Sequence, residues 1–309
     1  MDMPIAAHDI DYAENLLAAG ELETARVLLE ELAAEAGEYA DTACIATDAR
    51  QWFSFATPFE RLAYRRVERD PRELTQLDAP LDRLYAALAY VYVQKGEYES
   101  ARDALKQAVR WNPMNCAHRL NLAEVFRALG NTQEWAALSA SVLERATTPQ
   151  ALARAFANLG QFFLATDNVS AAEGCRRAAL RACEDDSVAT ALAARLDEEQ
   201  PEAQGISDVE VNAALDELGI MTGANAEIAV CLLMCATDAA AQGDRGEATR
   251  YTLLARDLVG APACEALIRL IHESDAELAQ AASESRAAAR GETPASDTAS
   301  PNVSEQEGE

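Results

Sequence analysis

The residue types that most often carry chemistry are sparse in this chain and poorly spaced for it. The histidines are His8, His118 and His272, and no zinc-type spacing joins them to cysteines. Cys231 and Cys235 lie one helical turn apart in CLLMC and could share a metal ion. Without a second close pair, we interpret them as buried cysteines that behave as small apolar residues. The sequence therefore predicts no metal site.

Motifs that would hold a cofactor or activate a nucleophile are also missing from the sequence. It contains neither a phosphate-binding glycine loop nor a dinucleotide-binding glycine pattern. It has no nucleophile elbow, and its acidic residues fall on helix faces predicted to be solvated. We expect no catalytic residues and no cofactor. An enzyme with an unrecognised site stays as an alternative, which a deep pocket with converging polar groups would favour.

Bulk properties limit the class of partner and the compartment. The formal net charge of −26 disfavours binding to nucleic acid or to an anionic membrane surface. Seven irregularly spaced cysteines suggest no disulfide framework. We find no signal segment at the start and no apolar run of membrane-spanning length. These observations favour a cytoplasmic protein whose partner is a protein or a peptide.

The elements behind this composition are clearest in residues 82–115, which read as one helix–turn–helix unit. Tyr85, Leu88 and Tyr92 recur at three- and four-residue steps and therefore share one helix face. Gly96 can adopt the left-handed conformation that ends a helix. A second helix follows, and Pro113 ends it because proline cannot continue the hydrogen-bond pattern.

This unit resembles a tetratricopeptide repeat, a 34-residue pair of antiparallel helices. With Asp82 as the first position, the large and small signature positions hold Tyr85, Leu88, Ala89, Tyr92, Gly96, Tyr98, Ala101, Leu105, Ala108 and Pro113. The resemblance implies an all-α fold, an α-solenoid of tetratricopeptide-like antiparallel helix pairs with atypical terminal helices. An ordinary helical hairpin is the simpler alternative.

Weaker copies of the unit surround it, and they define the expected organisation. We predict a degenerate helix pair over 1–39, three repeats over 82–186, and a C-terminal repeat with capping helices over 187–282. Within the second repeat, Trp135 occupies a position that is normally small. Residues 283–309 are rich in Ser, Ala, Thr, Pro and Glu, and we expect them to be disordered.

Residues 40–81 depart from the repeat pattern, and we interpret them as an atypical helical insertion. Thr57-Pro58 predicts the start of a helix that ends near Arg69. Arg61, Arg65 and Arg69 are spaced by four and would share one face. The stretch WFSFATPFERLAYRR and the repeats after it resemble, over residues 50–185, a bacterial repeat family of unknown function. That resemblance implies a bacterial cytoplasmic setting and no activity.

The tetratricopeptide resemblance implies that the first helix of each pair lines a concave surface. The candidate peptide-binding residues there are Arg83, Tyr90, Gln94, Asn121, Glu124, Arg127, Arg154, Asn158 and Gln161. Some members of the family clamp a C-terminal carboxylate with Lys and Asn, but Ala86 and Tyr90 occupy those positions here. We therefore expect a mixed groove for an acidic–apolar peptide rather than that clamp.

Two functions follow from these features. The first is a non-enzymatic protein–protein interaction scaffold or adaptor that binds a peptide or protein on the concave surface. The second is a regulatory or sensory subunit that docks in a larger complex through the Arg61–Arg72 helix, with Arg61, Arg65 and Arg69 as the docking patch. The sequence determines neither the partner nor the oligomeric state.

Overall fold

The computed structural model describes residues 4–289 of the 309-residue chain, and these are mostly helical. In chain order the elements are α1 (Ala7–Ala18), α2 (Leu22–Ala43), β1 (Arg50–Phe53), α3 (Pro58–Glu68), β2 (Glu73–Gln76), α4 (Leu81–Gln94), α5 (Tyr98–Trp111), α6 (Cys116–Ala128), α7 (Thr132–Leu143), α8 (Pro149–Ala165), α9 (Val169–Ala182), α10 (Ser187–Glu199), a 3-10 turn (Pro201–Gly205), α11 (Asp208–Glu217), α12 (Ala226–Ala241), α13 (Arg245–Val259) and α14 (Ala261–Ala289). The all-α prediction is confirmed, apart from two short strands.

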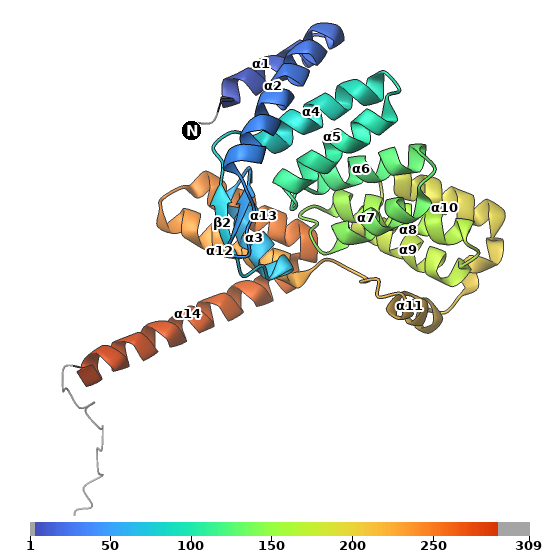
Figure 1. Ribbon diagram of the computed structural model, residues 1–309. Coiled ribbons are helices and arrows are strands. Elements are labelled where there is room, and N and C mark those ends of the chain that lie inside the picture. The colour runs from blue at the N-terminus through green and yellow to red at the C-terminus, as the bar shows by residue number, and fades with distance from the viewer. Residues whose placement is uncertain (1–3, 290–309) are drawn as a thin grey trace, which may run out of the picture. The chain divides into compact units, whose positions relative to one another are not determined.

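Four antiparallel helix pairs, α1–α2, α4–α5, α6–α7 and α8–α9, follow one another and pack side by side (Figure 1). Tight turns join the helices of each pair. Gly20, Gly96 and Gly130 have positive φ at three of these turns, as a left-handed helix end requires. In the fourth pair Asp167 adopts this conformation at φ 59°, which Asp tolerates better than most residues. The predicted repeats over 82–186 are thus present as helix pairs.

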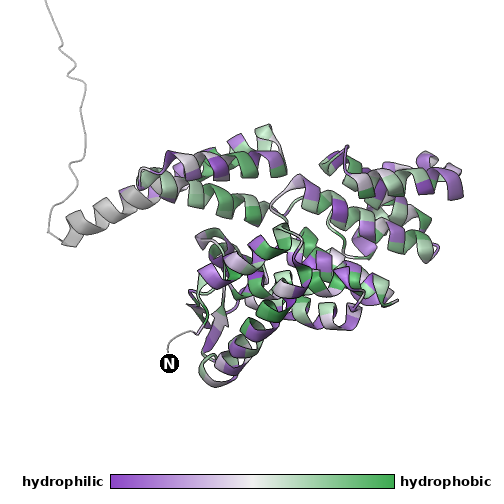
Figure 2. Ribbon diagram, turned by 90° about the horizontal axis from the view of Figure 1, so that it is seen from above, coloured by the Kyte–Doolittle hydropathy of each residue, from purple (hydrophilic) through white to green (hydrophobic). Residues whose placement is uncertain are grey.

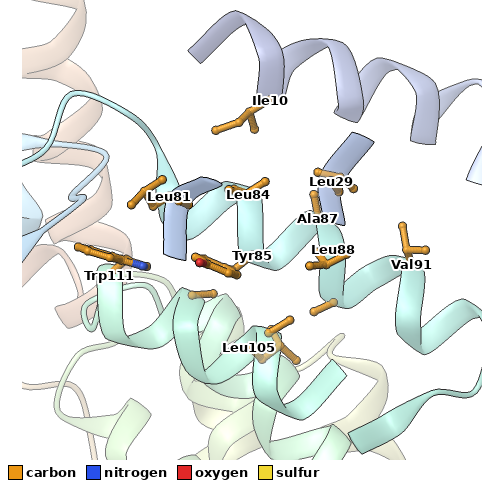
Figure 3. Close-up of a cluster of buried hydrophobic side chains, with 14 of the residues drawn as sticks. Ile10, Leu29, Leu81, Leu84, Tyr85, Ala87, Leu88, Val91, Leu105 and Trp111 are labelled. Atoms are coloured by element: carbon orange, nitrogen blue, oxygen red, sulfur yellow. The ribbon is translucent and has the colours of Figure 1, made fainter. Parts of the chain in front are cut away.

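The core of the first two pairs is built around α4. Leu81, Leu84 and Leu88 of α4 are buried, and Figure 3 shows them between Ile10 and Leu29 on one side and Leu105 on the other. Both faces of α4 are covered because α2 and α5 pack against it. Each helix carries hydrophobic and hydrophilic residues along its length (Figure 2), as amphipathic helices do.

Small residues let the paired helices approach closely, as their signature positions predicted. Ala89, Ala101 and Ala108 are buried between α4 and α5. Gly160 of α8 lies so close to α10 that an added Cβ would come within 2.4 Å of a Leu192 methyl group. Trp135, at a normally small position, is buried in the α6–α7 pair with 5% of its surface exposed. The α6–α7 pair therefore accommodates one large residue at a position that is small in the repeat pattern.

The insertion between the first two pairs is not purely helical, which corrects the prediction for residues 40–81. β1 and β2 form a parallel two-stranded sheet in which Phe53 pairs with Gln76, and α3 is the crossover between them. Thr57 caps α3 and Pro58 is its first residue, as predicted. The rings of Phe53 and Tyr64 lie 4.6 Å apart, so aromatic contacts pack α3 onto β1.

The C-terminal part of the array does not continue the stack in sequence. α10 packs on α8 and α9, and α11 packs on α9. The last predicted repeat forms the α12–α13 hairpin, but α12 packs against α3 near the other end of the chain. Arg66 of α3 pairs with Glu227 of α12 at 3.2 Å, and the rings of Phe59 and Tyr251 lie 6.2 Å apart. The expectation of sequential stacking was wrong for this hairpin.

The chain divides into two units, residues 1–264 and a second unit from Glu265 onward. α14 continues through residues 283–289, which we had predicted to be disordered. The rest of that predicted tail, residues 290–309, lies outside the described residues. Among the described residues, no helix has the length and apolar character needed to cross a bilayer.

Candidate protein-binding surface

A groove of about 250 Å³ runs between α4 and α6, on the surface that the repeat pattern predicted to be concave. The helix faces that form it combine small, aliphatic and aromatic side chains with a few polar ones. Its lining residues are Ala86, Ala89, Tyr90, Val93, Tyr98, Leu105, Asn121, Glu124 and Val125. Of the predicted peptide-binding residues, the structure brings Tyr90, Asn121 and Glu124 together here.

Two tyrosines give this groove its exposed aromatic surface. Tyr90 of α4 is 49% exposed and Tyr98 of α5 is 37% exposed. Neither hydroxyl forms a hydrogen bond within the described part of the chain, so both stay available to a ligand. Ala86 and Ala89 leave room beside the Tyr90 ring. The groove can therefore accept an apolar side chain and offer a hydroxyl to a nearby backbone group.

Polar side chains connect α6 to α8 beyond the groove. Glu124 forms a 2.6 Å ion pair with Arg127, whose guanidinium also donates to Gln161 at 3.5 Å. Arg127 lies over the Trp135 ring, 5.4 Å from its centroid. These three predicted binding residues lie near one another, but Arg127 is already engaged by its neighbours. Gln94 is exposed at the end of α4.

Two predicted binding residues have intramolecular partners, and the assignment of the buried one, Asn158, is corrected. Asn158 is completely buried and donates to Ser139 at 3.2 Å, so it cannot touch a ligand on the surface. The Ser139 hydroxyl donates to the Trp135 carbonyl at 2.9 Å and accepts from Asn158, so this buried polar pair is hydrogen-bonded within the core. Arg83 pairs with Asp11 at 2.7 Å and with Glu14, and therefore fastens α4 to α1.

The arginine patch lies on α3 and its C-terminal end, and its side chains have no ion-pair partner in the described part of the chain. Arg61, Arg65 and Arg69 are exposed, and none of them forms an ion pair within residues 4–289. Arg69 follows the last helical residue and has φ 52°, so only Arg61 and Arg65 share the helix face. The opposite side of α3 is covered by α12. The patch therefore presents positive charge on an otherwise acidic chain.

A buried polar cluster that the sequence did not reveal joins α3, α4 and α6. Asn112 donates to Glu60 at 3.1 Å and to Asp82 at 3.0 Å, and Asp82 also meets the His118 imidazole at 3.2 Å. Burial raises the pKa of Glu60, and the Asp82 charge adds to this effect. The sequence contains one indication of this cluster: polar residues stand at several positions that face the core.

This cluster has the residue types of a catalytic site, but its Asp82–His118 pair is almost completely buried. The Asp82 and His118 side chains are 2% and 9% exposed. Burial raises the pKa of the neighbouring Cys116 thiol to about 12, so a thiolate nucleophile is not available there at neutral pH. We interpret the cluster as a structural contact that holds α3, α4 and α6 together. Cys231 and Cys235 are also buried, and burial raises the pKa of each thiol to about 11.

Comparison with known proteins identifies the central unit. The tetratricopeptide-repeat family profile matches residues 82–115, which form α4 and α5. No curated protein matches the chain.

Solved structures with similarity to the chain include the PilF protein of Pseudomonas aeruginosa, at 19% identity and a TM-score of 0.42 over 86% of this chain and 96% of that one. A tetratricopeptide repeat protein from Parabacteroides merdae has 14% identity and a TM-score of 0.33 over 85% and 97% of the two chains. BtubC from P. vanneervenii has 15% identity and a TM-score of 0.31 over 97% and 95%. These TM-scores are below 0.5 and carry no argument about partners or activity.

Proposed function

We propose that this tetratricopeptide-repeat protein is a non-enzymatic interaction scaffold, and that the groove between α4 and α6 holds an apolar side chain of a protein partner. Repeats of this type support a role in protein–protein interaction. The observation that carries the finer proposal is the exposed Tyr90 ring beside a 250 Å³ groove. Large aromatic side chains in such positions are frequent anchors of binding energy.

The groove favours a peptide or helix with one apolar anchor over a broad charged surface. Its walls are mostly apolar, and its polar residues, Asn121 and Glu124, lie on the α6 side. The exposed end of the Tyr90 ring can cover the anchor and exclude water from it. Helix-in-groove recognition uses anchors of this kind at three- and four-residue spacing.

Site-specific photocrosslinking in cells of the native source tests this proposal. A photoreactive phenylalanine analogue at position 90 should give a discrete adduct with a partner protein. The same analogue at Gln107, which is exposed on α5 and does not line the groove, should not. Equal labelling from both positions, or none from either, would refute binding in this groove.

A second candidate function is supported by the arginine patch. Arg61, Arg65 and Arg69 are exposed and unpaired within residues 4–289, which suits docking to an acidic protein surface in a larger complex. The variant Arg61→Glu/Arg65→Glu should then lose assembly while the circular dichroism spectrum stays unchanged. Arg181→Glu/Arg245→Glu is a matched control, because these exposed arginines lie on α9 and α13.

A further inference from the structure

A second cavity of about 550 Å³ lies away from the α4–α6 groove. One side is formed by the first turns of α6 and α8, and another by the α12–α13 hairpin. The start of α3 closes it, and the rings of Phe59 and Tyr251 join α3 to α13 there. This volume falls within the range of small-ligand pockets. The cavity exists because α12 packs back on α3 instead of continuing the stack.

The cavity has an apolar lining on both sides. Phe59, Met114 and Leu120 line one part of it, and Leu232, Tyr251 and Leu254 from the hairpin line another. An apolar ligand body of a few carbon atoms would lose water on entering this space. Removal of this apolar surface from water would favour binding.

The acidic groups at the cavity already have partners. One oxygen of Glu60 accepts from the backbone N–H groups of Ala56 and Thr57 and from Asn112. Asp186 accepts from two backbone N–H groups at the start of α10, with both distances 3.0 Å. Because both carboxylates accept hydrogen bonds within the protein, neither requires a cationic ligand.

The two cationic groups at the cavity, Arg154 and Arg250, differ in their partners. Arg154 of α8 is half-buried, lines the cavity and forms no side-chain hydrogen bond or ion pair within the described residues. Arg250 reaches the cavity from α13, where it stacks on Tyr251 at 4.3 Å and pairs with Glu247 at 2.6 Å. A free guanidinium beside an apolar lining selects an anion with an apolar body, and it suits the planar carboxylate group.

We propose that this cavity binds an apolar carboxylate, whose charged group pairs with Arg154 while its apolar body packs against Leu120 and Tyr251. The carboxylate has two possible sources: a small free acid, or an acidic side chain within a peptide. This site is distinct from the α4–α6 groove, and its occupation does not depend on Tyr90.

Isothermal titration calorimetry on the full chain tests the proposal with three probes. The first is 3-phenylpropionate, the second is its uncharged amide, and the third is a blocked Leu-Glu-Leu peptide. We expect at least one carboxylate probe to bind and the amide to bind about tenfold more weakly, because a charge-assisted hydrogen bond is lost. Arg154→Gln should weaken binding of the carboxylate probe by a similar factor, and Arg61→Gln should leave that binding unchanged.

A variant that fills the cavity adds an independent readout. Ala117→Trp places a large ring into the cavity from an exposed position on α6 and should abolish binding, whereas Tyr90→Ala should leave it unchanged. Binding of the free acid alone identifies a small-molecule site, and binding of the peptide alone identifies a peptide site. Failure of both carboxylates to bind, equal binding of the amide, or full binding by folded Arg154→Gln would overturn the proposal.

Discussion

Replacement of Gly160 by alanine tests how tightly the fourth helix pair, α8–α9, packs against α10. Gly160 lies in α8, where an added Cβ would approach a Leu192 methyl group to 2.4 Å and the Cys175 Cβ to 3.2 Å. Leu192 and Cys175 are both fully buried, so neither side chain can move into solvent. Alanine at this position therefore forces α8 and α10 apart or pushes Leu192 from its rotamer.

Two opposing effects set the size of the change in unfolding free energy. Alanine in place of glycine inside a helix contributes about 1 kcal/mol of stability. Overpacking of a filled core costs about 1 to 3 kcal/mol. The packing effect is the larger one at a 2.4 Å approach, and we expect a net loss of about 1 kcal/mol for Gly160→Ala.

Gly37 provides a matched control on α2, because an added Cβ there meets nothing within 4 Å. Gly37→Ala should raise the unfolding free energy by about 0.5 to 1 kcal/mol. Urea titrations followed by far-UV circular dichroism give both values, and hydrogen exchange of α10 locates the loss. Leu192→Ala should remove the clash, so Gly160→Ala should be harmless in that background. If Gly160→Ala stabilises the protein as much as Gly37→Ala does, the packing argument is wrong.

Three further predictions concern the surface and the buried cluster. Tyr90→Ala should weaken a captured partner about tenfold or more in a binding titration, whereas Tyr12→Ala, which changes an exposed tyrosine on α1, should have no effect. Arg61→Glu/Arg65→Glu should abolish assembly in size-exclusion chromatography if α3 is a docking site, and unchanged elution of the complex would dismiss that role. Glu60→Gln should gain unfolding free energy relative to wild type as the pH rises above about 4.5, the ordinary pKa of a Glu carboxyl. The folded state raises the Glu60 pKa above its ordinary 4.5, so the wild-type contribution is full below that value and is lost as the pH rises through the folded pKa. A difference between the two proteins that does not vary with pH would contradict this account.

The repeat pairs could be predicted from sequence because their stabilising contacts are local. The three- and four-residue spacing of Tyr85, Leu88 and Tyr92 and the glycine at position 96 are sufficient to place α4 and its end. The short strands β1 and β2 could not be found in this way. Each has four residues, and they pair with each other only because α3 carries the chain across.

The candidate site was predictable in its position and less so in its members. Tyr90, Asn121 and Glu124 occupy repeat positions that were expected to face the concave surface, and they line one groove in the structure. The prediction failed for Asn158 because a repeat position does not show whether the neighbouring helix carries a buried polar residue. Ser139 at a core position was the available signal, since a buried hydroxyl requires a partner. The 550 Å³ cavity depends on contacts between residues far apart in sequence and had no such signal.

The packing of α12 against α3 changes the order in which the chain is expected to fold. Arg66 and Glu227 are separated by 161 positions, so their contact closes a very large loop and forms late. A linear array can lose repeats from one end without disturbing the other. In this chain, removal of α12 and α13 would uncover a face of α3 and the aromatic ring of Phe59, more than 150 residues away. Shortened versions made for binding studies should therefore retain this hairpin, or the newly exposed surface will cause aggregation.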